Sequence, residues 1–173
     1  MAQPMFCFGY KLDASKKVSV KHSICTDILL EIIAGDCSPL YKRLMEDGLI
    51  NDNFSFEHFY GDGYNSVIFE GESADPKKVA EAIKEEINRI KREGIDKKLF
   101  AAIHRGLYGN AIRSFNNVEG IVMQLVDCAM NDTCLFDDIK YLKSISVEDV
   151  MKRLAYLDNE KTVLSIINPL SEG

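Results

Sequence analysis

The hydrophobic and polar positions of this 173-residue chain follow two patterns, one with a period of two and one with a helical period. In residues 5–12 the aromatic side chains Phe6, Phe8 and Tyr10 alternate with other residues, which predicts a first strand. In residues 18–34 isoleucines recur at every fourth position, which predicts a helix. The expected elements are a strand at 5–12, helices at 18–34 and 38–48, strands at 54–60 and 64–72, helices at 75–94, 97–115, 118–130, 136–145 and 146–154, and a closing strand at 162–168.

The middle of the chain predicts a β-hairpin. Two alternating runs are separated by the turn signal Gly61-Asp62-Gly63. In the first strand of this hairpin, the residues expected on one face are Phe54, Phe56, His58 and Tyr60. A hairpin makes at least part of the sheet antiparallel, and the helices are segregated from the strands along the chain. The pattern therefore predicts an α+β domain with two layers, a mostly antiparallel sheet covered by helices.

The stretch SPLYKRLMEDGLIN, residues 38–51, connects the two kinds of structure. Ser38 is typical of a helix start and Pro39 fits the first helical position. Leu44 continues the apolar side of this short helix, and Gly48 is expected to end it. Because an alternating run follows at once, we expect a buried hinge, with the last turn of the helix near the edge of the sheet.

The length favours a single domain, which we place at residues 4–170. Residues 1–3 form a start or linker, and residues 171–173 form a tail. The chain enters a strand after four residues and stops soon after another. We therefore expect an excised domain, that is, a fragment of a longer gene product.

Composition excludes several classes of partner. The net charge is −6 and the 21 basic residues are interleaved with acidic ones, which argues against nucleic acid. No apolar run approaches the roughly 20 residues that span a bilayer, and no secretory signal is present, so we expect no membrane partner. The five cysteines are an odd number without a CxxC pair, which indicates reduced thiols and a cytoplasmic protein.

A search for catalytic chemistry finds none in this chain. His22, His58 and His104 are the only histidines, and none belongs to an HxxEH or HExxH motif. The glycine-rich run at residues 61–66 joins two strands, so it is expected to be a turn, since a phosphate-binding loop needs a following helix. We therefore predict no catalytic residue and no metal ligand here.

Two stretches resemble the insulinase, pitrilysin and processing-peptidase family, the inverzincins. The family pattern S-x-L-F-x-x-L-R-E-x-x-G-L-x-Y, shortened by one residue before its glycine, is matched by Ser38, Leu40, Tyr41, Leu44, Glu46, Gly48 and Leu49. The second stretch, residues 107–150, is similar to the helical portion of bacterial members: it contains G-x-x-x-R-S-x-x-x-x-E, then LFD, then S-x-E-D-V. In this order the motifs cover one domain of the family's repeating unit.

The resemblance implies the C-terminal half of a zinc-dependent peptidase that cleaves peptides inside a chamber. The family's zinc motif, HxxEH with a distal Glu, belongs to the N-terminal half, so this chain alone is expected to be inactive and to hold no cofactor. Many C-terminal halves supply an Arg and a Tyr that grip the substrate backbone. At those positions this chain has Met45 and Asn51, so both substrate-binding roles are altered.

The resemblance implies three kinds of partner: the N-terminal half of the same protein, a peptide substrate, and a paralogous subunit in a homo- or heterodimer. The dimer applies to a split enzyme, in which one subunit carries zinc and the other carries the Arg/Tyr pair. Two alternatives stay open. One is a structural or assembly subunit with this fold and no proteolytic role. The other is an unrelated α+β ligand-binding module.

Overall fold

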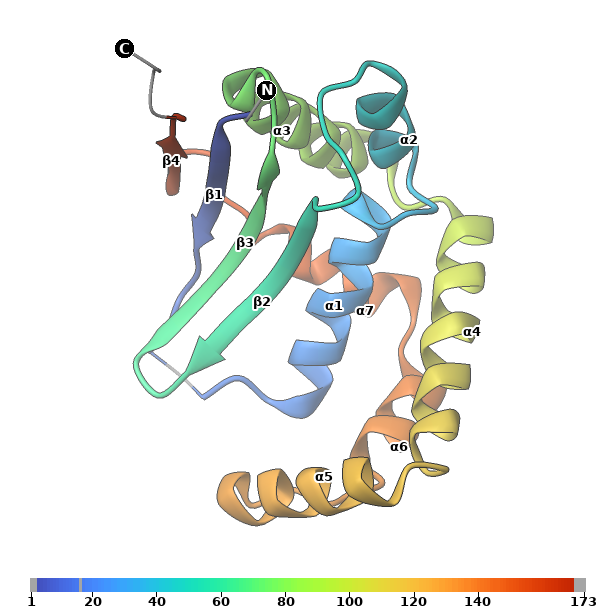
Figure 1. Ribbon diagram of the computed structural model, residues 1–173. Coiled ribbons are helices and arrows are strands. Elements are labelled where there is room, and N and C mark those ends of the chain that lie inside the picture. Colours follow the sequence, from blue (N-terminus) through green and yellow to red (C-terminus); the bar gives the residue numbers. More distant parts are fainter. Residues whose placement is uncertain (1–2, 16, 170–173) are drawn as a thin grey trace.

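The computed structural model describes residues 3–15 and 17–169 (Figure 1). The strands are β1 (Met5–Lys11), β2 (Ser55–Gly61), β3 (Tyr64–Glu72) and β4 (Thr162–Ile167). The helices are α1 (Val20–Ala34), α2 (Pro39–Glu46), α3 (Pro76–Glu93), α4 (Lys97–Ser114), α5 (Val118–Asn131), α6 (Asp137–Ser144) and α7 (Val147–Leu154). Each lies within two residues of its expected bounds. Residues 1–2 of the expected start, Leu170 and the tail 171–173 lie outside the described residues.

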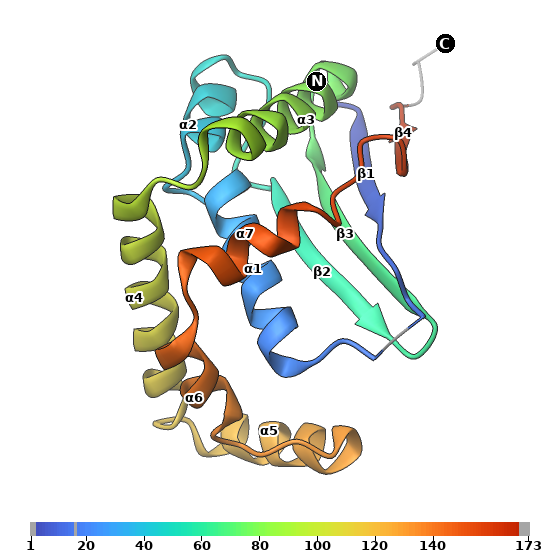
Figure 2. The same cartoon turned by 180° about the vertical axis from the view of Figure 1, so that it is seen from behind.

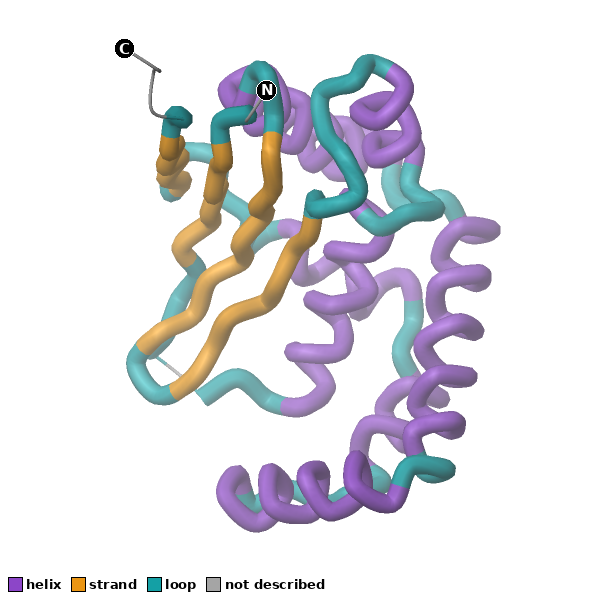
Figure 3. Tube along the Cα trace, in the orientation of Figure 1, coloured by secondary structure: helices purple, strands orange, loops and turns teal. Residues whose placement is uncertain are grey.

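The strands form one sheet in the order β2-β3-β1-β4, and all three neighbouring pairs are antiparallel (Figure 3). Across the sheet, Phe8 of β1 is paired with Phe69 of β3 and with Leu164 of β4. The helices lie on one side of this sheet, as the view from behind shows (Figure 2). The two-layer α+β architecture expected from the sequence is therefore confirmed.

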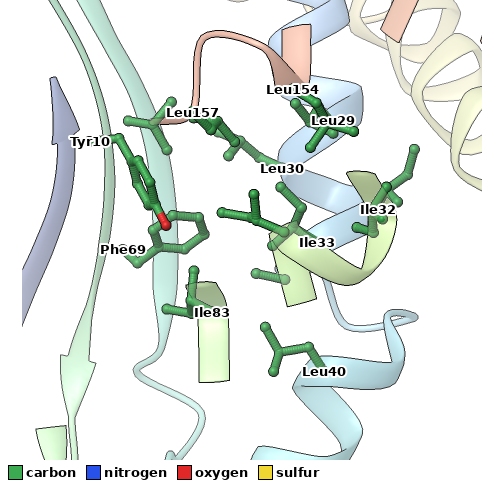
Figure 4. Close-up of a cluster of buried hydrophobic side chains, with 14 of the residues drawn as sticks. Tyr10, Leu29, Leu30, Ile32, Ile33, Leu40, Phe69, Ile83, Leu154 and Leu157 are labelled. Atoms are coloured by element: carbon green, nitrogen blue, oxygen red, sulfur yellow. The ribbon is translucent and has the colours of Figure 1, made fainter. Parts of the chain in front are cut away.

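The two layers meet through a core of aromatic and aliphatic side chains. Phe8 and Tyr10 point from the sheet toward the helices, and each is only 1% exposed. Figure 4 shows Tyr10 and Phe69 of the sheet beside aliphatic side chains of α1, α2, α3 and α7, including Ile33 and Ile83. Helix α1 is the central element, because it packs against β2 and against α2, α3, α4, α6 and α7.

Helix α7 is fixed across α1 by polar contacts. The Ser146 hydroxyl accepts the backbone N–H of Asp149 while the Asp149 side chain accepts the N–H of Ser146, a complete capping box. Further along, Arg153 is 7% exposed, and its Nε donates to Oγ1 of Thr26 on α1 at 3.0 Å. Its guanidinium also lies 4.3 Å from the ring centre of Tyr156.

The structure refines two sequence expectations about the hairpin region. Tyr60 lies on the same side of β2 as His58, with the ring centroids 4.6 Å apart, but it is 40% exposed, because β2 is an edge strand whose end extends beyond the helices (Figure 1). The strand also does not follow α2 at once. After Gly48, which has φ +65° and ends the helix as expected, Leu49 and Ile50 are buried before β2 begins.

His58 and Asn65 are buried polar residues of the hairpin. The Nε2 atom of His58 lies 3.0 Å from Oδ1 of Asn65, whose Nδ2 donates to the carbonyl of Asp13. This assignment makes Nε2 the protonated nitrogen. The Nδ1 atom is buried and has no hydrogen-bond partner among the described residues. Burial lowers the pKa of His58 and outweighs the opposing effect of Asn65, so the imidazole is neutral in the folded protein.

Truncating a core side chain should cost a large part of the stability. Ile83→Ala removes a fully buried side chain between α3 and the sheet, and we expect the free energy of unfolding to fall by about 2–5 kcal/mol. Val163→Ala is the control, because Val163 is 71% exposed, and should change stability by about 0.5 kcal/mol or less. Urea unfolding followed by circular dichroism measures both. Equal losses in the two variants would contradict the core assignment.

Acid should destabilise the fold through His58. Its folded pKa lies below the unfolded value of about 6.5, so the stability present above pH 6.5 is lost as pH falls through the folded pKa. We expect His58→Gln to flatten the decrease in unfolding free energy between pH 7.5 and 5.5, measured by urea titration. Asp27 acts in the opposite direction, since desolvation and the charges of Asp138 and Glu31 raise its pKa to about 6. Asp27 is present both in the unchanged chain and in the His58→Gln variant, so its effect cancels when their pH profiles are compared. Identical pH profiles would contradict this role of His58.

Candidate functional site

No helix or strand of the described residues covers the face of the sheet that turns away from the helices (Figure 1). Side chains alternate along a strand, so the neighbours of the buried Phe6 and Phe8 point to this second face. Met5 of β1 is 55% exposed, and Val163 and Ile167 of β4 are 71% and 68% exposed. This surface, which we call the bare face, therefore presents apolar side chains to solvent.

Two adjoining hollows lie at one end of the bare face, where β1 begins and β3 and β4 end. The first has a volume of about 430 Å³ and is lined by Gln3, Met5, Asn51, Glu72, Ile167, Asn168 and Pro169. The second has about 400 Å³ and is lined by Met5, Phe6, Cys7, Asn53, Glu70, Gly71, Glu72, Ser165 and Ile167. They share Met5, Glu72 and Ile167, which occupy paired positions on three neighbouring strands.

The loop from α2 to β2 forms the wall of these hollows. Within it, Oδ1 of Asn51 accepts the backbone N–H of Asn53, and the carbonyl of Asn51 accepts the N–H of Phe54. The Asn51 amide can then reach the sheet, where its Nδ2 donates to Oε2 of Glu72 at 2.9 Å. Gly71 permits this approach, because a Cβ there would lie 3.1 Å from the Cα of Phe54.

The hollows carry unneutralised negative charge. Glu70 and Glu72 lie two residues apart on one side of β3, and neither belongs to a salt bridge within the described residues. Burial and the charge of Glu70 raise the pKa of the Cys7 thiol, so this cysteine is protonated and a poor nucleophile. The arrangement can bind a cationic group beside apolar surface.

The two substrate-binding positions predicted from the sequence lie in different surroundings. Asn51 lines the first hollow and contacts Glu72. Met45 lies on α2, packs against the core and lines neither hollow. The substrate roles of both positions stay predictions. Sequence reasoning missed Glu70 and Glu72, although their alternation with Val67 and Phe69 could have placed them on the solvent side.

His58 and His104 lie in separate environments. His58 contacts Asn65, while a ring nitrogen of His104 contacts the backbone carbonyl of Leu142. Within residues 3–15 and 17–169, no three His, Cys, Asp or Glu side chains are placed to hold a metal ion. Among the same residues, no helix is both long and apolar enough to cross a bilayer.

Comparisons with known proteins give a consistent relationship. Residues 1–107 match the family model described as the peptidase M16 inactive domain. The chain is 30% identical over 134 residues to the uncharacterized zinc protease YmfH of Bacillus subtilis, covering 78% of this chain and 31% of that protein. It thus spans about a third of this relative's length.

Solved structures share the fold. An M16-like peptidase from Alicyclobacillus acidocaldarius superposes with a TM-score of 0.90 at 22% identity, covering 98% of this chain and 42% of that one. The inactive peptidase domain of a zinc protease from Bordetella parapertussis gives a TM-score of 0.82 at 13% identity, covering 100% of this chain and 94% of that one. With the family match over residues 1–107, these findings show that the chain belongs to the peptidase M16 inactive-domain family.

Proposed function

We propose that this chain is the non-catalytic C-terminal domain of a zinc-dependent peptidase, and that its bare face forms part of the chamber in which peptides are cleaved. The observation that carries the proposal is the one-sided sheet, with two hollows on the face that the helices leave open. Because an extended peptide needs a long, shallow and partly apolar surface, such a face suits peptide binding better than a compact small-molecule site.

The chemistry of cleavage would come from a companion half. Relatives extend well beyond this domain, since the chain covers 42% of the Alicyclobacillus structure and 31% of YmfH. We propose that the N-terminal half of the same protein holds zinc and activates water, while this domain contributes shape and charge. The single domain at residues 4–170 would then be one of two similar halves. The proposed compartment is the cytoplasm, supported by the five free cysteines.

Glu70 and Glu72 give the proposed chamber a preference for positively charged side chains. A lysine or arginine side chain lying along Met5 and Ile167 could place its aliphatic stem on apolar surface and its charge beside these carboxylates. Because Asn51 donates to one oxygen of Glu72, the other carboxylate oxygen can accept from the ligand. We therefore propose peptides with a basic residue as preferred substrates.

A second candidate is a structural or assembly subunit without proteolysis. Among the described strands β4 lies at the edge of the sheet, and this favours an assembly role because an edge strand can pair with another chain. A dimer with a paralogous subunit would suit either function. The two candidates differ in whether the longer protein, which contains this domain and the companion half, binds zinc and cleaves peptides.

Metal content separates the roles of the two halves. We expect the purified 173-residue chain to bind far less than one zinc per molecule and to leave a fluorogenic peptide library uncut. The longer protein should contain stoichiometric zinc and cleave. Plasma mass spectrometry and fluorescence measure the two quantities. Stoichiometric zinc or cleavage in the short chain would refute the assignment, and a longer protein lacking both would favour the structural subunit.

Removing the charge of the hollows should weaken the use of basic peptides. In the longer protein, we expect the double variant Glu70→Gln, Glu72→Gln to raise KM for lysine-containing peptides by roughly three- to tenfold, because the variant loses two partly exposed charge contacts with the peptide. Neutral peptides of equal length should keep their KM. Glu57→Gln is the matched control, since Glu57 is exposed on β2 and lines neither hollow. An equal effect on neutral and basic peptides would exclude the charge contact.

A further inference from the structure

Helix α5 stands apart from the rest of the domain. None of its residues is buried, and it lies at the opposite end of the domain from α2, α3 and the start of β1 (Figure 1). At its end, Nζ of Lys17 donates to the carbonyl of Asn131 at 3.1 Å. Just beyond its two ends, the rings of Phe115 and Phe136 stack with centroids 5.6 Å apart. Neither contact uses a side chain of α5, so the side chains of the helix stay largely exposed.

One side of α5 is apolar and exposed. The residues on this side, which we call the α5 stripe, are Val118, Val122, Leu125, Val126 and Ala129. Four of them follow the 4-3-4 spacing of a helix that packs along a partner. Val118 is 76% exposed, and Val122 is 52% exposed. The stripe covers no part of the domain's own core.

The surroundings of the stripe are acidic. Residues 117–139 contain five acidic residues and no lysine or arginine, in a chain whose total charge is −6. Burial and the charges of Asp137 and Asp127 raise the pKa of Asp138, so these carboxylates repel one another. This charge opposes docking of an anionic membrane, of nucleic acid or of a second acidic copy of the same helix. It favours a polypeptide with basic residues flanking an apolar surface.

The length of the relatives identifies the source of such a polypeptide. More than half of the Alicyclobacillus structure and of YmfH lies outside the region that this chain covers. An exposed apolar helix face in a monomer marks a contact surface. We propose that the α5 stripe is the docking surface for a basic, amphipathic segment of the companion half. This inference rests on the proposed pairing of two halves, but it does not require that the pair be a peptidase.

Hydrogen exchange of α5 tests the inference directly. We expect the amides of residues 118–131 to exchange on the order of tenfold more slowly in the longer protein than in the 173-residue chain, because docking suppresses local opening. Val122→Glu combined with Leu125→Glu should restore fast exchange there. Val163→Glu, on the exposed side of β4, is the matched control and should leave α5 protected. Equal exchange in the two proteins, or protection that survives the double variant, would overturn the docking surface.

Two further measurements test the chemistry and the source. If the partner is basic, raising sodium chloride from about 50 to 500 mM should speed exchange of α5 in the longer protein, since salt screens the attraction. Protection independent of salt would contradict a basic partner. If sedimentation shows a dimer of the short chain that the double variant abolishes, the occupant is a second copy and the proposal fails. Zinc content and cleavage are measured separately. If α5 is protected in a longer protein that neither binds zinc nor cleaves peptides, the proposed peptidase function fails and the proposed docking surface stands.

Discussion

The fold depends on burying one face of a four-stranded sheet against helix α1. Phe8, Tyr10 and Phe69 contribute aromatic area from the strands, and α1 meets them with aliphatic side chains that are almost entirely inaccessible to water. Because α1 is surrounded by the sheet and by other helices, it cannot shift without opening the core. Helices α2, α3 and α7 are positioned by their contacts with it. This one interaction therefore orients most of the domain.

The same constraint explains why the opposite face is available. Since α1 and the helices packed against it lie on one side of the sheet, the side chains of the strands that point to the other side stay in contact with solvent. Met5, Glu72 and Ile167 come together there only because three strands are paired in a specific register. The loop after α2 then closes one side through the contact between Asn51 and Glu72. The domain thus offers a shaped, acidic surface, and its described residues include no group of three His, Cys, Asp or Glu side chains placed to hold a metal ion.

Local pattern predicted the elements well, because period, caps and turn residues act over a few positions. Ser38-Pro39 and Gly48 lie at the start and the end of α2, where the sequence placed them. The hollows were not predictable in this way, since they depend on the register of strands that are distant in the sequence. The exposure of the α5 stripe was not predictable either, because a helical period reveals an apolar side without revealing what covers it. The exposure of Tyr60 was not predictable for a related reason: alternation does not show where the covering layer ends.

The central claim is that peptides lie on the bare face of this domain while another half performs the chemistry. Photocrosslinking in the longer protein tests it most directly, with an extended, basic peptide that carries benzoylphenylalanine, and with adducts mapped by mass spectrometry. The account predicts adducts in this domain at β1, β3 and β4 around Met5, Glu72 and Ile167. Adducts confined to the helical layer, or to the companion half alone, would contradict it.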